Sequence, residues 1–412
     1  MRALLFGPTG IKLRDEEDKA GVIPKLRSYA YRQRMAQDSR VRDDKHNVFS
    51  KKYLTAYYLE EDVLKNKMSW VGFLDLDDYE KQQRLCSDSL REIVGRINKE
   101  KPDNAFLCMN MPYMRDSRFF PAPDIGAIRN FHPNVIIVLI EELHAVWQRV
   151  NILRELQGKT RSRFRLSELL AWRSASLWVA DILAGVLKIP RYIVGVKHPP
   201  EMLYRLLFKP EILRVYASFP IGETRGYQDM RSKIDEIRYR LHEEFCVFDP
   251  LAIDDRVVVN KLEAVESGAE MLSGGKLVLN KQDRWPLKDG FPMCEDEDKL
   301  YPIEIELDEV KEVRTSVDNH IRIRDFLLIN DVDAVVVIRP YIMGKATTGV
   351  TREVAHANEV GKPVYFYWPP EDGGRSTFAQ SPFSGKGILL ETLDDLINEL
   401  KKEEQKKHRR TL

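Results

Sequence analysis

The chain has 412 residues, of which 43% are hydrophobic, so it is long enough for two or three domains that each bury a core. Lysine and arginine total 65 against 64 acidic residues, a balance that argues against a nucleic-acid partner or an anionic membrane surface. The four cysteines lack the spacing of a zinc site or a disulfide framework, so we expect no metal site and a reducing cytoplasm.

We expect no signal for export in the chain. Its opening, MRALLFGPTG, has too short an apolar run for a signal peptide, and we find no later segment that approaches the roughly 18 apolar residues of a membrane span. We therefore expect a soluble, cytoplasmic protein.

Short apolar runs recur along the first half, with helical stretches between them. Continuous runs of this kind are typical of strands buried on both faces, and the intervening helices indicate a parallel sheet with crossovers. The runs lie at residues 2–6, 105–110, 135–140 and 191–196. They predict a first domain over residues 1–205.

The pattern restarts in the second half. Strands are predicted at 214–220, 246–250, 333–338 and 363–368, with helices at 234–245, 319–330 and 349–360. A Gly-, Asp- and Glu-rich stretch at about 254–310 reads as an excursion from this second domain, which spans 206–412. The predicted fold class is α/β, with two doubly wound parallel-sheet domains.

In such sheets ligands bind at the carboxyl ends of the strands, where loops lead into helices. One of these loops ends in Thr347, Thr348 and Gly349 at the predicted start of the 349–360 helix. Hydroxyls and free backbone N–H groups at a helix start form a favourable place for an anion. This segment is therefore a candidate phosphate site.

Glu353 lies within the apolar face of the same predicted helix, and Asp325 lies on the apolar face of the 319–330 helix. Two carboxyls in apolar surroundings can have divergent pKa values, one staying ionised as a nucleophile and the other retaining a proton. That pairing suits cleavage of a glycosidic bond. A plainer alternative is that Glu353 reaches solvent, or pairs with Arg339 or Arg352.

The second half resembles the nucleoside 2-deoxyribosyltransferase superfamily, and most closely its deoxynucleoside monophosphate N-glycosidases. The resemblance runs in order through VYASFPIGETRG, IRIRDFLLINDVDAVVVI, TTGVTREVAHANEVGKPV and YFYW. It implies Glu353 as the nucleophile and Asp325 as the proton donor. It also implies a sugar and phosphate pocket lined by Tyr216, Ser218 and Arg225, and a homo-oligomer.

Thr347 stands where the nucleoside transferases commonly have an aspartate and the monophosphate hydrolases a hydroxyl residue, which favours a nucleotide substrate. The loop RPYIMGKATTG is longer than the family's usual loop, and Phe219-Pro220 replace small or hydroxyl residues. The base, the sugar and the choice between water and a second base as acceptor stay open.

The first half resembles nucleoside monophosphate kinases of the adenylate kinase type, with an altered P-loop. The loop FGPTGIKLRDE has Gly7 and Gly10, but Lys12 comes one residue early and Leu13 replaces the hydroxyl residue that holds magnesium. A nucleotide could still bind here, aided by arginines whose plainer role is surface solvation: Arg149, Arg161, Arg163 and Arg165.

The sequence thus predicts an enzyme that cleaves or transfers the N-glycosidic bond of a nucleoside or nucleotide and requires no cofactor. Two alternatives remain open. One is a non-catalytic nucleotide-binding or sensing protein. The other is an active nucleoside monophosphate kinase.

Overall fold

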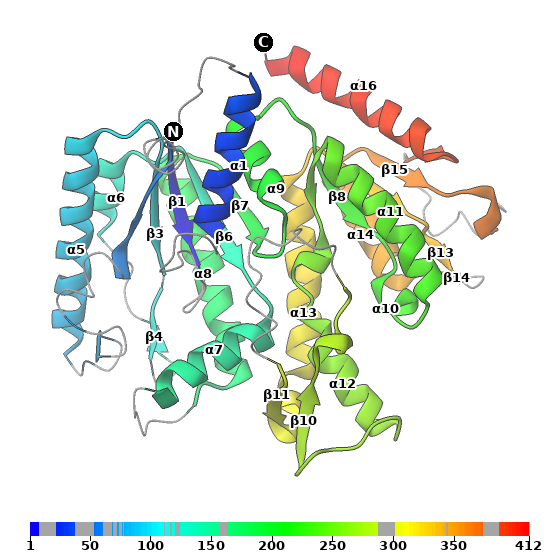
Figure 1. Ribbon diagram of the computed structural model, residues 1–412, viewed down its shortest axis with the longest axis horizontal. Coiled ribbons are helices and arrows are strands. Elements are labelled where there is room, and N and C mark those ends of the chain that lie inside the picture. Colours follow the sequence, from blue (N-terminus) through cyan, green and yellow to red (C-terminus); the bar gives the residue numbers. More distant parts are fainter. Residues whose placement is uncertain are drawn as a thin grey trace. The chain divides into compact units, whose positions relative to one another are not determined.

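The structure is a computed structural model (Figure 1). It describes residues 1–7, 22–37, 53–60, 68, 72–73, 76, 78–110, 112–115, 118–119, 124–156, 163–286, 301–342, 345–373 and 387–411. The chain forms two compact units: unit 1 is Met1–Lys197 with Ile253–His320, and unit 2 is His198–Ala252 with Ile321–Leu412.

Unit 1 is built on a five-stranded sheet in the order β2-β3-β1-β6-β7, in which every pair of neighbours is parallel. The strands are β1 (Arg2–Phe6), β2 (Thr55–Tyr58), β3 (Ala105–Met109), β6 (Val135–Ile140) and β7 (Arg191–Gly195). Every residue of β3 and of β6 is buried. Burial on both faces explains why these strands read as continuous apolar runs.

Helices flank the sheet of unit 1 (Figure 1). They are α1 (Val22–Gln37), α5 (Tyr79–Glu100), α6 (Ile125–Phe131), α7 (Leu143–Leu156) and α8 (Leu166–Leu187), and a small hairpin joins β4 (Met114–Arg115) to β5 (Arg118–Phe119). The four strands predicted in this half are confirmed, whereas β2 was missed because TAYY is a short run.

The segment predicted as an excursion from the second domain belongs to unit 1 instead. It contains α12 (Arg256–Glu266), the antiparallel pair β10 (Lys276–Leu279) and β11 (Ile303–Glu306), and the start of α13 (Leu307–Asp331). The carboxylate of Asp255 accepts a hydrogen bond from Leu143 N at 2.7 Å and pairs with Arg173 at 2.5 Å. These buried polar contacts attach the segment to α7 and α8. The amino-acid composition of the segment could not predict them.

Unit 2 holds the second five-stranded parallel sheet, in the order β16-β15-β12-β8-β9. Its strands are β8 (Arg214–Ser218), β9 (Cys246–Phe248), β12 (Ala334–Ile338), β15 (Val364–Tyr367) and β16 (Gly387–Leu390). Its other elements are α9 (Pro200–Phe208), α10 (Ile221–Thr224), α11 (Gln228–Glu244), the hairpin β13 (Tyr341–Ile342) and β14 (Lys345–Ala346), α14 (Thr348–Glu359) and α16 (Leu393–Thr411).

The two sheets establish the predicted fold class: an α/β protein with two doubly wound parallel sheets. In chain order, the strands of unit 2 stand as 2-1-3-4-5. In that order the connections diverge between the first and third strands, here β8 and β12, and ligands bind at the carboxyl ends of the strands at such a switch point. The fold therefore directs attention to the residues that follow these two strands.

Among the described helices, α8 alone has the length and apolar composition to cross a membrane. The expectation that no segment approaches the apolar length of a membrane span is therefore wrong for α8. One such helix is weak evidence for a membrane span, because core helices of soluble proteins share these properties. In its middle, Arg173 is ion-paired with Asp255, and the helix contacts β6 and β7. These contacts are typical of a helix packed in a folded domain.

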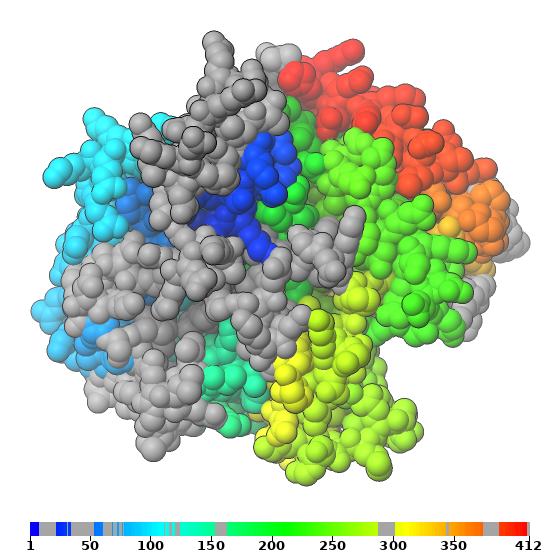
Figure 2. Space-filling model, in the orientation of Figure 1, coloured from blue at the N-terminus to red at the C-terminus, as the bar shows by residue number. Residues whose placement is uncertain are grey.

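The basic C-terminal segment forms α16, which appears red on the surface in Figure 2. Its inner side is tied to the sheet of unit 2, because Glu404 accepts a hydrogen bond from Leu213 N at 2.7 Å and Lys407 pairs with Asp333 at 2.8 Å. Lys402 and Lys406 are exposed and pair within the helix. This charge run is thus a solvated helix face.

Candidate functional site in unit 2

The candidate site begins on β8, where Tyr216 and Ser218 are spaced by two residues and so point to the same side of the strand. Both residues are completely buried. The Tyr216 hydroxyl donates to Glu353 Oε1 at 2.9 Å, and the Ser218 hydroxyl donates to Glu353 Oε2 at 2.5 Å. Each carboxylate oxygen of Glu353 therefore has a hydroxyl partner, which fixes the orientation of the group.

Glu353 is carried by α14, the helix that follows β12 and packs on β12 and β15. Val350, Val354 and Ala357 form the buried face of this helix. Glu353 lies beside that face and is partly accessible to solvent. The hydrogen bonds from β8 show the inward orientation that was predicted for its carboxylate.

The surroundings of Glu353 favour its protonated form. Burial is the largest cause and the negative charge of Asp325 is the next, and together they raise the pKa of Glu353 to about 8. The hydrogen bonds from Ser218 and Tyr216 and the positive charge of Arg324 act in the opposite direction. A carboxyl that is strongly desolvated yet partly accessible is suited to act on a small bound molecule.

Asp325 lies on the part of α13 that belongs to unit 2, and its residue is 7% exposed. Its charge raises the pKa of both Glu353 and Tyr216, so it lies within electrostatic reach of both groups. Arg324, which is 6% exposed, approaches Asp325 Oδ1 with Nη2 at 2.8 Å and Nε at 3.0 Å. Sequence reasoning missed Arg324, because two adjacent helix residues are not expected to share a buried site.

The segment between β12 and α14 contributes further residues to the candidate site. Thr347 occupies the N-cap position of α14 and is 4% exposed, and its hydroxyl has no hydrogen-bond partner among the residues that the structure describes. Its carbonyl, by contrast, accepts from Thr351 N at 3.0 Å and Thr351 Oγ1 at 2.8 Å. Thr348 and Gly349 form the exposed first turn of the helix, whose backbone N–H groups lack intrahelical partners. Arg225 ends α10, on the connection that follows Ser218.

Arg339 and Arg352, the arginines considered as partners for Glu353, have other surroundings. Arg352 is exposed. Arg339 directly follows β12 in a left-handed conformation, with φ of 49°, which is costly for a residue other than glycine. Its guanidinium pairs with Asp372 and, at 3.0 Å, with Glu371. The ion pair fastens the turn after β15 at the carboxyl edge of the sheet.

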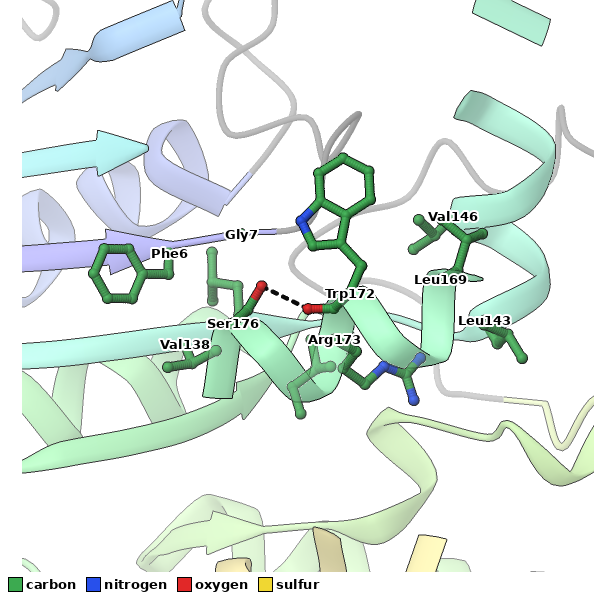
Figure 3. A pocket seen from close by; sticks show the side chains of 11 residues that line it. Phe6, Gly7, Val138, Leu143, Val146, Leu169, Trp172, Arg173 and Ser176 are labelled. Carbon is green, nitrogen blue, oxygen red and sulfur yellow. Dashed lines mark hydrogen bonds between the residues drawn. The ribbon is translucent and has the colours of Figure 1, made fainter. Parts of the chain in front are cut away.

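Unit 1 has a pocket of its own at the carboxyl ends of β1 and β6. Figure 3 shows the Trp172 indole projecting from α8 between Phe6 on one side of the view and Val146 and Leu169 on the other, with the Arg173 side chain directed away from the indole. The lining is mostly apolar and includes Gly7, which follows β1. Gly10 and Lys12 of the predicted phosphate loop lie outside the described residues.

A buried charge network follows β6 in unit 1, and sequence reasoning missed it. Glu142 pairs with Lys197, and His144 Nε2 lies 3.4 Å from Glu142 and 2.8 Å from the Tyr301 hydroxyl. The cations hold the pKa of Glu142 at about 2 against the effect of burial. Of the arginines proposed for nucleotide binding, Arg149 and Arg165 pair with Glu141 and Glu312, and Arg161 lies outside the described residues.

Metal ligation gains no support from the part of the chain that the structure describes, where no three histidine, cysteine or acidic side chains gather in a group that could hold an ion. The chain matches no protein-family model and no curated protein.

Proposed function

We propose that the protein cleaves or exchanges the N-glycosidic bond of a nucleoside or nucleotide in unit 2. Glu353 attacks C1′ of the sugar, with the carbon–nitrogen bond breaking through an oxocarbenium-like transition state. The departing base takes a proton from Asp325. Water or a second base then releases the sugar from the carboxylate.

The observation that carries this proposal is the arrangement around Glu353. Both of its oxygens are held by hydroxyls of β8, and a second acid, Asp325, lies within electrostatic reach. Two carboxyls in one partly desolvated site, one of them fixed in orientation, are what a glycosidase requires. The group lies on the helix that follows β12, beside the switch point of the sheet, where ligands of this fold class bind.

The start of α14 supports a substrate that carries a phosphate. A buried hydroxyl without a partner has lost its hydration, and it regains a hydrogen bond if a ligand oxygen reaches it. The exposed first turn of the helix adds backbone N–H groups and the positive end of the helix dipole. We therefore assign Thr347, Thr348 and Gly349 to a phosphate of the substrate. The buried free thiols Cys86, Cys108 and Cys246 fit a cytoplasmic enzyme.

The test is to incubate the protein with a panel of nucleosides, nucleoside monophosphates and dinucleotides and to separate liberated bases by chromatography. Release of a base with water alone indicates a hydrolase, whereas release that depends on a second base indicates a transferase. Binding of a panel member without any release of base would contradict the proposal and favour a sensing protein.

Thr347→Val is expected to raise the free energy of unfolding by about 1 kcal/mol, because it removes a buried hydroxyl that has no partner. The same change is expected to raise KM for monophosphates about tenfold, since it removes a hydrogen bond to a charged group, and to leave KM for nucleosides unchanged. Urea unfolding and steady-state kinetics measure the two effects.

Thr351→Val is the matched control, because it makes the same substitution one helix turn later, where the hydroxyl is bonded to the Thr347 carbonyl. It should not raise stability or discriminate between phosphorylated and unphosphorylated substrates. Equal KM changes for both substrate classes in Thr347→Val would remove the phosphate assignment.

A further inference from the structure

The two carboxyls of the site have partners of different kinds. Glu353 receives hydrogen bonds from two neutral hydroxyls, Tyr216 and Ser218. Asp325 is contacted by a guanidinium, that of Arg324, at 2.8 and 3.0 Å. A cation within this distance stabilises a carboxylate far more than a neutral donor does, most of all where both groups are buried.

We propose that Arg324 is a positioning residue that keeps Asp325 ionised in the free protein, so that the single proton of the pair is held on Glu353. The charged and titratable groups that act on Glu353 come from two other elements of unit 2: Tyr216 on β8, and Arg324 and Asp325 on α13. Arg324 is the one cation among these groups, and its guanidinium contacts Asp325.

This assignment matters for the proposed reaction, on which its functional meaning rests. Attack at C1′ needs one carboxylate, and departure of the base needs one proton. A pair that holds one charge and one proton supplies both once the proton passes from Glu353 to Asp325 on substrate binding: the Glu353 carboxylate then attacks, and Asp325 gives the proton to the base. Without Arg324, two desolvated carboxyls within electrostatic reach of each other would both tend to be protonated near neutral pH, and no carboxylate would be available for attack.

The decisive measurement does not depend on turnover. Infrared spectra of the free protein, recorded from pH 4 to pH 10, follow the carbonyl band of protonated carboxyls, and the band lost in Glu353→Gln identifies Glu353. In the wild type this band should disappear with a midpoint at about pH 8. A midpoint near the ordinary glutamate value of about 4.3 would overturn the assignment of the proton.

Arg324→Met should move the Glu353 midpoint up by about one pH unit or more, the size expected for loss of a nearby opposite charge. Arg324→Lys keeps the charge and should restore most of the wild-type midpoint. The matched control is Arg322→Met, which removes an exposed arginine of the same helix and should leave the midpoint unchanged. Equal midpoints in Arg324→Met and Arg322→Met would overturn the role of Arg324.

Asp325→Asn covers the case in which Arg324→Met does not fold. It removes the negative charge that the proposal places beside Glu353, so the Glu353 midpoint should fall; an unchanged midpoint would show that Asp325 carries no charge. If these titrations behave as expected and no nucleoside of the panel is cleaved, the proposed function fails while the charge assignment stands. If bases are released and the midpoints do not move, only the role of Arg324 fails.

Discussion

Replacing Glu353 with glutamine is expected to lower the rate of base release by roughly 10³-fold or more, the scale seen when a covalent nucleophile is removed. Glutamine has nearly the same shape and can still accept hydrogen bonds from Tyr216 and Ser218, so the site should keep its geometry. It cannot form the bond to C1′. The measurement is kcat for the best substrate of the panel, by chromatography of the free base.

Glu359→Gln provides the control for this substitution. Glu359 is an exposed acid on the same helix, so its change to glutamine alters the charge of α14 without touching the site. Its kcat should stay within about twofold of the wild type, because a surface substitution that does not touch the site has a small effect. Retention of more than a tenth of wild-type activity in Glu353→Gln would contradict a nucleophilic role for Glu353.

The second large effect concerns stability and pH. The pKa of Glu353 is about 8 in the folded protein, against an ordinary value of 4.5. The folded state therefore binds this proton more strongly than the unfolded chain does. The resulting stabilisation is complete below pH 4.5 and is lost as the pH rises through 8, with a slope of up to about 1.4 kcal/mol per pH unit. We expect a total loss of roughly 5 kcal/mol.

This loss is measured as a difference between proteins. Urea unfolding at pH 5 and at pH 8.5 gives the change in the free energy of unfolding for the wild type, and Glu353→Gln lacks the titrating group. The change in unfolding free energy of Glu353→Gln is subtracted from that of the wild type. The contributions of those other ionisable groups that titrate alike in both proteins cancel. Glu359→Gln should show the wild-type pH dependence. Equal pH dependence in the wild type and Glu353→Gln would show that the pKa of Glu353 is not raised.

These two expectations describe opposite consequences of one carboxyl. A group that is desolvated and lies near a second acid weakens the fold at alkaline pH, and the same surroundings are those that we propose for its reaction with a bound sugar. Arg339 in unit 2 shows a related feature, since its left-handed backbone holds a strained turn at the carboxyl edge of the sheet. Strain of this kind persists because the ion pairs with Asp372 and Glu371 hold it.

Much of the fold follows from local patterns. Apolar runs such as VIIVLI became buried parallel strands because burial on both faces leaves no room for polar residues. The strands TAYY and GILL were missed; each lies at the edge of its sheet and is only partly buried, unlike the central strands. The segment after residue 253 was placed with the wrong half, since its attachment depends on Asp255 and Glu309 meeting distant partners in unit 1.

For the site, the sequence by itself placed Glu353 and Asp325 on apolar helix faces, because helical periodicity depends only on spacing along the chain. Only the tertiary structure decided that Tyr216 and Ser218 hold the two oxygens of Glu353, that Arg324 contacts Asp325, and that the buried Thr347 hydroxyl has no partner in the described part of the chain. These features join strands and helices that are far apart in the chain, and their charges depend on burial and on distances that no local pattern contains.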